Sequence, residues 1–213
     1  MKPVRVAAAV AIGASMAAPA AAQLAPGRSG SSTMQYVGGE EVWRDVEAFG
    51  ACYAGTERKD ALKLIATEPG SRAEAETYRE LFRKPYQSCL GDIVELRAPH
   101  TMIRGAIAEG LYRKGIPLPP ELALPAPQPA QVRNLAGAAR CYVAMHPDEA
   151  RRLLETGPGS RKEHDAVVSL MPEFGKCVPE QAKFGFAATL IRYRIAEALY
   201  RTGAATRAAA EKK

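Results

Sequence analysis

Apolar side chains recur along most of this chain with the spacing of an α-helix. In the segment 41–54, Val42, Val46, Phe49 and Tyr53 are separated by four, three and four residues. Spacings of three and four place side chains on one helix face, whereas a strand alternates every second residue. Few segments alternate in that way, so the pattern predicts an all-α protein.

The helical pattern occurs twice, because landmark residues return at a nearly constant distance. Cys52 and Cys141 are 89 residues apart, and Cys89 and Cys177 are 88 apart. The motif Arg-x-x-Ile-Ala-Glu-x-Leu-Tyr-Arg stands at 104–113 and again at 192–201. Self-similarity at a fixed period is the signature of a duplication. We therefore expect two tandem modules of about four helices each.

Composition along the chain suggests where these modules begin and end. The stretch between them is rich in proline, which cannot continue a helix, so it is expected to be an extended, semi-rigid connector. The tail either extends the last helix or frays. The expected divisions are a signal peptide at 1–22, a Gly- and Ser-rich flexible leader at 23–38, repeat 1 at 39–115, the linker at 116–129, repeat 2 at 130–203 and the tail at 204–213.

Helix starts and stops can be assigned within each repeat. Ser71 precedes Glu74 by three residues, and Ser160 precedes Glu163 in the same way. This spacing predicts a capping box, in which the Ser hydroxyl accepts from the Glu amide and the Glu carboxylate reaches back to the Ser amide. The third helix of each repeat then begins there. First helices are expected at 41–54 and 130–144, second helices at 61–67 and from 147, and fourth helices at 99–114 and 184–201.

Two further features concern the third and fourth helices. Pro85 and Pro172 are expected to kink the third helix or to begin a short new turn. Glu109 with Arg113, and the matching Glu197 with Arg201, have the favourable order for ion pairs four residues apart. We expect these pairs on the solvent-exposed face, where such bridges contribute little.

The N-terminus has the layout of a secretory signal peptide. Lys2 and Arg5 precede an uncharged apolar stretch from residue 6 to about 18, and small residues at 20–22 offer a cleavage site before Gln23. The stretch is short for a membrane span, which needs about 20 residues. The sequence therefore predicts export to the periplasm or the medium, with no membrane span after the signal is removed.

The four cysteines fall at two matched places in the repeats. An even count with repeated spacing in an exported chain indicates disulfides. Four cysteines allow three pairings, and the duplication favours Cys52–Cys89 and Cys141–Cys177, each within one repeat. The chain has no Cys-x-x-Cys pair, and the histidines of repeat 2 have no counterpart in repeat 1. We therefore expect no metal site.

Charge and motifs narrow the function classes. The formal net charge is +6, and basic and acidic residues are interleaved with few aromatics. A nucleic-acid surface would need clustered basic residues with stacking platforms, so we expect no nucleic-acid partner. The patterns of phosphate loops, dinucleotide-binding folds, zinc peptidases and serine hydrolases do not occur. We therefore expect no catalytic residue and no cofactor.

The leading hypothesis is a non-enzymatic envelope interaction module that binds an envelope protein or an anionic envelope polymer. Arg104, Tyr112, Arg192 and Tyr200 would contribute to a groove between the repeats, although packing and solvation explain these four residues better than binding does.

Two other classes stay open. An enzyme acting on an envelope polymer or small molecule would need polar residues in only one repeat, such as His146 and His164. A structural or stress-related periplasmic protein is the third class.

Overall fold

The computed structural model describes residues 39–83, 87–90, 96, 98–179 and 188–211. Within these ranges the regular elements are helices, with no strand, so the predicted all-α class is confirmed. The residues from 39 onward belong to a single compact unit. The predicted signal peptide and leader lie outside the described residues.

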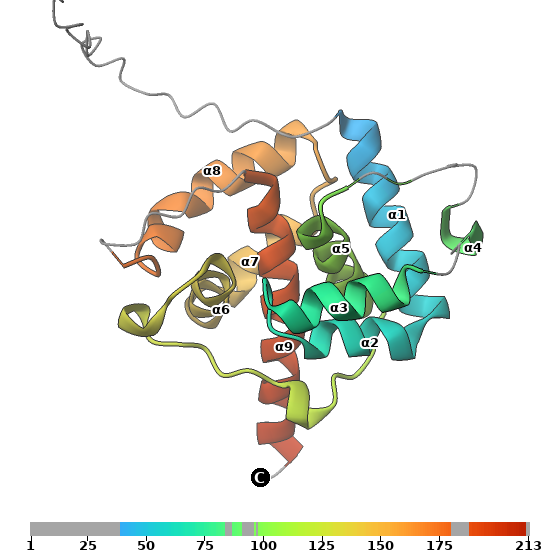
Figure 1. The fold of residues 1–213 in the computed structure, drawn as a ribbon. Coiled ribbons are helices and arrows are strands. Elements are labelled where there is room, and N and C mark those ends of the chain that lie inside the picture. The colour runs from blue at the N-terminus through green and yellow to red at the C-terminus, as the bar shows by residue number, and fades with distance from the viewer. Residues whose placement is uncertain (1–38, 84–86, 91–95, 97, 180–187, 212–213) are drawn as a thin grey trace, which may run out of the picture. The chain divides into compact units, whose positions relative to one another are not determined.

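The helices before the proline-rich stretch form a first series along the chain, and those after it form a second (Figure 1). The first series is α1 (Glu40–Thr56), α2 (Arg58–Ala66), α3 (Arg72–Leu81), α4 (Gln87–Leu90) and α5 (His100–Arg113). The second series is α6 (Leu135–Met145), α7 (Pro147–Leu154), α8 (Arg161–Gly175) and α9 (Ala188–Glu211). Between them lie two short 3₁₀ turns, η1 (Pro120–Leu122) and η2 (Pro129–Gln131).

Several boundaries differ from the sequence prediction. Helix α6 begins at Leu135, because Asn134 caps it by accepting from the amide of Gly137 at 2.8 Å. Helix α8 continues through Pro172 to Gly175, and Pro85 lies outside the described residues. Helix α9 extends well beyond the expected end at 201, so the tail prolongs the last helix. The linker is interrupted by η1 and η2 rather than extended throughout.

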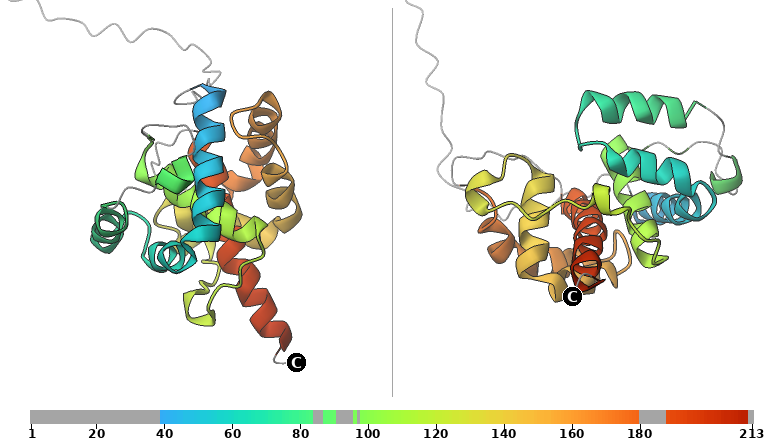
Figure 2. Two further views of the ribbon diagram at one scale, coloured as in Figure 1. Left: turned by 90° about the vertical axis from the view of Figure 1, so that its right-hand side faces the viewer. Right: turned by 90° about the horizontal axis from the view of Figure 1, so that it is seen from below.

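Helices α5 and α9 form the centre of the packing. Helix α5 contacts α1, α2 and α9, while α9 also contacts α6, α7, α8 and η1. Figure 2 shows α9 lying between α5 and the helices of the second series. Every residue of α5 from Met102 to Leu111 is buried. Because α5 has helices on several sides, it is buried almost all round rather than along one face.

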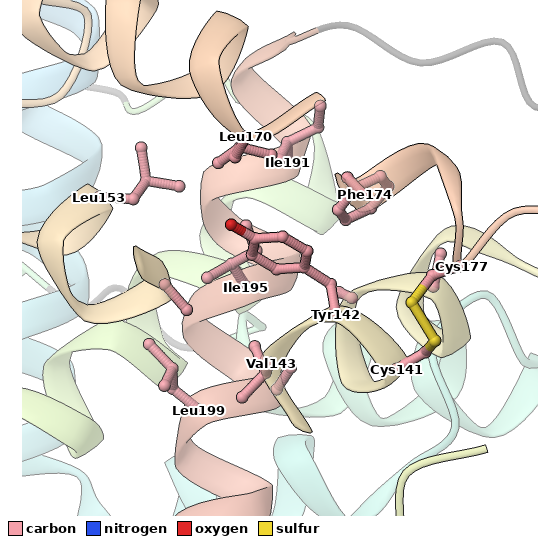
Figure 3. Packing of buried hydrophobic residues seen from close by; sticks show 14 of the residues in the cluster. Cys141, Tyr142, Val143, Leu153, Leu170, Phe174, Cys177, Ile191, Ile195 and Leu199 are labelled. Carbon is pink, nitrogen blue, oxygen red and sulfur yellow. A yellow bond between two sulfur atoms is a disulfide. The ribbon is translucent and has the colours of Figure 1, made fainter. Parts of the chain in front are cut away.

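Each series contains one disulfide. Cys52 of α1 is bonded to Cys89 of α4, and Cys141 of α6 is bonded to Cys177, just after α8. Both bonds are those predicted from the spacing of the cysteines. In the second series Cys141 and Cys177 border a core that includes Tyr142, Phe174 and Ile195 (Figure 3). Two disulfides fit an oxidising environment outside the cytoplasm.

Glycine at position 105 allows α5 and α9 to approach closely. A Cβ atom at this position would lie 2.1 Å from the Cβ and 2.9 Å from the Cα of Tyr193. A methyl group there would have to push the two backbones apart. We expect Gly105→Ala to lower the free energy of unfolding by about 1–3 kcal/mol, the usual cost of overpacking a core.

The measurement is denaturant unfolding, with Gly175→Ala as the control. Gly175 ends α8, and a Cβ there would meet no atom within 4 Å. Alanine also has the higher helix propensity, so the control is expected to keep or raise stability. Equal effects of the two substitutions would contradict the close approach of α5 and α9.

Candidate functional site

Two arginines and two glutamates form reciprocal ion pairs between α5 and α9. Arg104 donates through Nη2 to Glu197 Oε1 at 2.7 Å and through Nε to Oε2 at 2.9 Å. Arg192 donates through Nη2 to Glu109 Oε1 at 2.6 Å and through Nε to Oε2 at 3.0 Å. Arg104 and Arg192 are 0 % and 1 % exposed. Both ion pairs are bidentate, which is the strongest geometry for an arginine and a carboxylate.

Each guanidinium also holds the end of a neighbouring helix. Arg104 donates to the carbonyl oxygens of Leu64 and Thr67, at 2.8 and 2.9 Å, at the C-terminus of α2. Arg192 donates to those of Leu153 and Leu154, at 3.1 and 3.2 Å, at the C-terminus of α7. The last carbonyls of a helix lack partners within it, and a cation suits their partial negative charge.

A second pair of arginines crosses between the series to the same helix ends. Arg201 of α9 donates to the carbonyl oxygens of Ile65 and Thr67, beside α2. Arg113 of α5 donates to the carbonyl oxygen of Leu154, the last residue of α7. Each of these helix ends is therefore held by one arginine from its own series and one from the other series.

Two further glutamates complete the network and cap α3 and α8. The Glu74 and Glu163 Oε1 atoms each accept from an arginine Nη1 at 3.3 Å, Glu74 from Arg104 and Glu163 from Arg192. Ser71 and Ser160 accept from the glutamate amides, as expected.

The second hydrogen bond of the predicted capping box, from the serine amide to the glutamate carboxylate, does not form in either series. The second carboxylate oxygen accepts from the Gly70 amide just before α3 and from the Gly159 amide just before α8, not from the serine amides. The Ser71 and Ser160 amides already donate to the carbonyl oxygens of Glu68 and Gly157.

The charges of the network are set by burial and by its own members. Burial raises the pKa of Glu197, but Arg104, Arg201 and Arg194 lower it more strongly, to about 2. Glu197 is therefore ionised at neutral pH. Burial likewise opposes the charge of Arg104, and Glu197 with Glu74 outweighs it and raises the pKa of that guanidinium. Glu197 and Arg104 therefore stabilise each other as ions.

The expectation that Glu109 and Glu197 lie on a solvent-exposed face is wrong. Both i,i+4 pairs exist, with Arg113 2.8 Å from Glu109 and Arg201 3.3 Å from Glu197. However, Glu109 and Glu197 are 1 % and 4 % exposed. The opposite central helix covers them and supplies Arg192 and Arg104 as their main partners.

The four residues proposed for a groove between the repeats do not gather at one surface. Arg104, Arg192 and Tyr200 are buried, the two arginines in the ion-pair network and Tyr200 in the apolar core of the first series. Tyr112 is only partly buried. Of the four side chains, Tyr112 alone lines one of the described hollows.

That hollow, which we call the Tyr112 hollow, has a volume of about 330 Å³. Its wall is mostly apolar, and a cation and two hydroxyls lie on it. Three parts of the chain meet there: the end of α5, the linker, and the second series. It is lined by Tyr112, Leu124, Pro125, Ala126, Val143, Ala144, Pro147, Arg151, Leu199, Thr202 and Gly203. Two of these residues, Val143 and Leu199, also belong to the apolar core of the second series (Figure 3).

Arg151 supplies the charge of the Tyr112 hollow. Its side chain is about half exposed and contacts Asp148 of the same helix. The contact with Asp148 raises the pKa of the guanidinium, and Tyr112 adds to the rise. The hollow therefore presents a guanidinium, paired on one side with Asp148, beside an apolar wall, which suits a ligand with an apolar body and a group that accepts from Arg151.

The two histidines of the second series do not come together. His146 lies 3.4 Å from Glu173 and 3.8 Å from Glu149, which in turn accepts from the Tyr142 hydroxyl at 2.9 Å. His164 borders a different hollow, beside Ser160 and Asp165. Among the described residues no three His, Cys, Asp or Glu side chains are placed to hold a metal ion.

Comparisons of the chain with protein-family models, with curated proteins and with solved structures found no match. No helix in the described part of the chain combines the length and the apolar character that crossing a membrane requires. The geometry of the chain itself is therefore what bears on function.

Proposed function

We propose that this protein is an exported, non-catalytic module that binds another envelope protein through the Tyr112 hollow. The observation that carries the proposal is the hollow itself, where an apolar wall and the Arg151 cation meet at the junction of α5, the linker and the second series. Its volume of about 330 Å³ lies at the lower end of the range for ligand sites. Such a site suits a small part of a larger partner.

The charged residues at the centre of the molecule support a role in binding rather than catalysis. Four of these residues are buried and form hydrogen bonds with one another, and the two arginines also donate to the carbonyl oxygens at helix ends. They are Arg104, Arg192, Glu109 and Glu197. A catalytic acid or base has to reach a substrate. These four groups act instead as a rigid support for the helices around the hollow.

The proposal includes a duplicated architecture, with repeats at 39–115 and 130–203 and the linker at 116–129. Three kinds of contact support it, because each recurs at matched positions. Arg104 with Glu197 mirrors Arg192 with Glu109, the Ser71 cap mirrors the Ser160 cap, and the two disulfides close loops of 37 and 36 residues. Reciprocal contacts of this kind are those of a two-fold interface.

The proposal also includes export, with cleavage after Ala22 and residence in the periplasm or the medium. The positive start, the apolar stretch and the small residues at 20–22 support it, and so do the two disulfides. Mass spectrometry of the intact exported protein tests this part directly. A mature chain that begins at Gln23 is the expected result, and an uncleaved chain would contradict it.

Site-specific photocrosslinking in cells that export the protein tests the binding function. A benzophenone amino acid at position 144, on the wall of the Tyr112 hollow, is expected to give adducts with a partner protein. The same group at position 168 is the control, because Val168 is 49 % exposed on α8 and is not part of the hollow. Adducts at both positions alike, or at neither, would contradict the proposed function.

A further inference from the structure

The Tyr112 hollow has a counterpart on the first series, and the chain fills that counterpart itself. The lining residues Tyr112, Val143 and Leu199 correspond in sequence to Tyr200, Ala54 and Leu111. In the structure these three counterparts are buried, at 3 %, 0 % and 0 % exposed, in one apolar cluster. Val143 and Leu199 are buried as well, at 2 % and 4 % exposed, so the two sides differ at the tyrosine, which is buried at position 200 and partly exposed at position 112.

The linker supplies the residues that cover the first-series counterpart. Leu118 is 6 % exposed and belongs to the same cluster as Tyr200, and Ile116 and Leu122 pack against that cluster. The 3₁₀ turn η1, which contains Leu122, also contacts α9. The segment Ile116-Pro117-Leu118 therefore packs its two aliphatic side chains on the cluster that contains Tyr200, while Pro117 between them is exposed.

A single backbone turn explains the difference between the two sides. After α5 the chain reverses at Gly115, whose φ of +61° favours glycine, and the Ile116 amide donates to the Leu111 carbonyl oxygen. The corresponding Gly203 has no positive φ, and α9 continues through it as a helix. Figures 1 and 2 show these last turns of α9 running away from the other helices.

The positions that correspond to Ile116 and Leu118 are therefore not folded back over the Tyr112 hollow. They carry Ala204 and Thr206, whose side chains are smaller or more polar than the aliphatic pair. Tyr112 stays partly exposed where Tyr200 is buried.

We propose that the Tyr112 hollow binds, from another protein chain, an extended aliphatic–Pro–aliphatic segment followed by an acidic residue. The aliphatic part of this ligand is inferred from the first-series counterpart, where Ile116 and Leu118 of the linker pack. The acidic residue is inferred from Arg151, which lines the Tyr112 hollow and whose counterpart in the first series is the uncharged Leu62. The inference rests on the proposed function and names the chemistry of its partner.

The linker sequence itself provides the probe, since Glu121 follows Leu118 by three residues. A synthetic peptide Gly-Ile-Pro-Leu-Pro-Pro-Glu-Leu-Ala, the sequence of residues 115–123, is titrated into the full oxidised protein by fluorescence anisotropy. We expect saturable binding with a Kd of about 10 μM to 1 mM, the affinity of a small patch. The same peptide with Ser for Ile116 and Leu118 is expected not to bind.

Matched variants locate the binding. Ala144→Phe fills the hollow and is expected to weaken binding by at least about tenfold, as the loss of a central contact does. Met145→Phe changes the next residue, which is exposed and is not part of the lining, and is expected to leave the Kd unchanged. Arg151→Ala is expected to weaken binding about threefold to tenfold, with the effect shrinking at high salt. Arg152→Ala, its neighbour outside the hollow, is the charge control.

Three results would overturn the inference. They are no binding of the peptide at millimolar concentration, binding that Ala144→Phe leaves unchanged, and binding of octanoate at the hollow without binding of the peptide. If crosslinks form at position 144 but any of these results is found, the proposed binding function stands and only the inferred chemistry of the bound segment is contradicted. Peptide binding without crosslinks in cells would keep the chemistry of the hollow and remove the envelope partner.

Discussion

Replacing Arg104 by Met is expected to lower the free energy of unfolding by about 3–5 kcal/mol, the cost of removing one partner from a buried ion pair. Methionine fills most of the volume but donates no hydrogen bond. The carbonyl oxygens of Leu64 and Thr67 would lose their donor, and Glu197 would lose its two-pronged partner inside the molecule. The measurement is urea unfolding of the oxidised protein, followed by circular dichroism.

Two comparisons separate the network from a general effect of removing charge. Arg192→Met removes the matching guanidinium and is expected to cost a similar amount, because its contacts repeat those of Arg104. Arg72→Met removes an arginine whose side chain is 91 % exposed in a pair with Glu76, and is expected to leave the unfolding midpoint unchanged. A loss below about 1 kcal/mol for Arg104→Met would mean that water replaces the guanidinium, and that the network does not hold α2 and α9 together.

An acid titration gives the network a second signature. The folded-state pKa of Glu197, about 2, lies below its ordinary value of 4.5. A group whose pKa is lowered by folding contributes stability above its unfolded pKa and loses that contribution as the pH falls through its folded pKa. The part of the stability that Glu197 contributes therefore disappears between about pH 4.5 and pH 2. Exposed pairs such as Arg72 with Glu76 contribute little in this window.

Local features of the fold could be predicted from the sequence because each depends on neighbouring residues. The Ser71 and Ser160 caps follow from a fixed spacing to a glutamate, and the helical class follows from the period of the apolar residues. The two disulfides follow from matched cysteine positions. The spacing of apolar residues did not predict every buried position. It placed Val42 on the buried face of the first helix, but Trp43 is the residue that is buried, at 1 % exposed.

The ion-pair network could not be predicted because burial of a charged residue depends on the whole fold. Glu109 and Arg113 have the spacing of a surface pair, and the spacing is the same whether the helix faces water or another helix. One signal did exist. Arg104 and Glu109 return as Arg192 and Glu197, whereas the two residues after the arginine change, from Gly105 and Ala106 to Tyr193 and Arg194. Charges retained in both series while a neighbour changes so much indicate a shared internal partner.

The open hollow was equally hidden, because it arises from a difference between the two series rather than from a motif. Tyr112 and Tyr200 are matched in sequence, yet one borders a hollow and the other lies in the core. The deciding element is the chain after each tyrosine, which reverses at Gly115 but continues helically through Gly203. Comparison of the segments that follow two matched helices is therefore informative where the helices themselves are alike.

Removing the Cys141–Cys177 disulfide by replacing both residues with Ala is expected to lower the free energy of unfolding by about 3–4 kcal/mol, from the chain entropy of the unfolded state. The bond joins residues separated by 36 positions, and without it the unfolded chain gains the freedom of that loop. Both cysteines are buried beside Tyr142 and Phe174, so the substitution also removes some packing. Guanidinium chloride unfolding of the oxidised wild type and the double variant measures the loss.

The matched comparison is Cys52→Ala with Cys89→Ala, which opens a loop of nearly equal length and is expected to give a similar loss, because the entropic part depends on loop length. Adding a reductant should lower the free energy of unfolding of the wild type to that of a variant that lacks all four cysteines. The same reductant should leave the free energy of unfolding of that variant unchanged. A loss below about 1 kcal/mol for either pair would mean that the unfolded loop stays compact without its bond. A large loss for only one pair would instead show that local packing, which differs between Cys89 and Cys177, outweighs loop entropy, since the two loop lengths are almost the same.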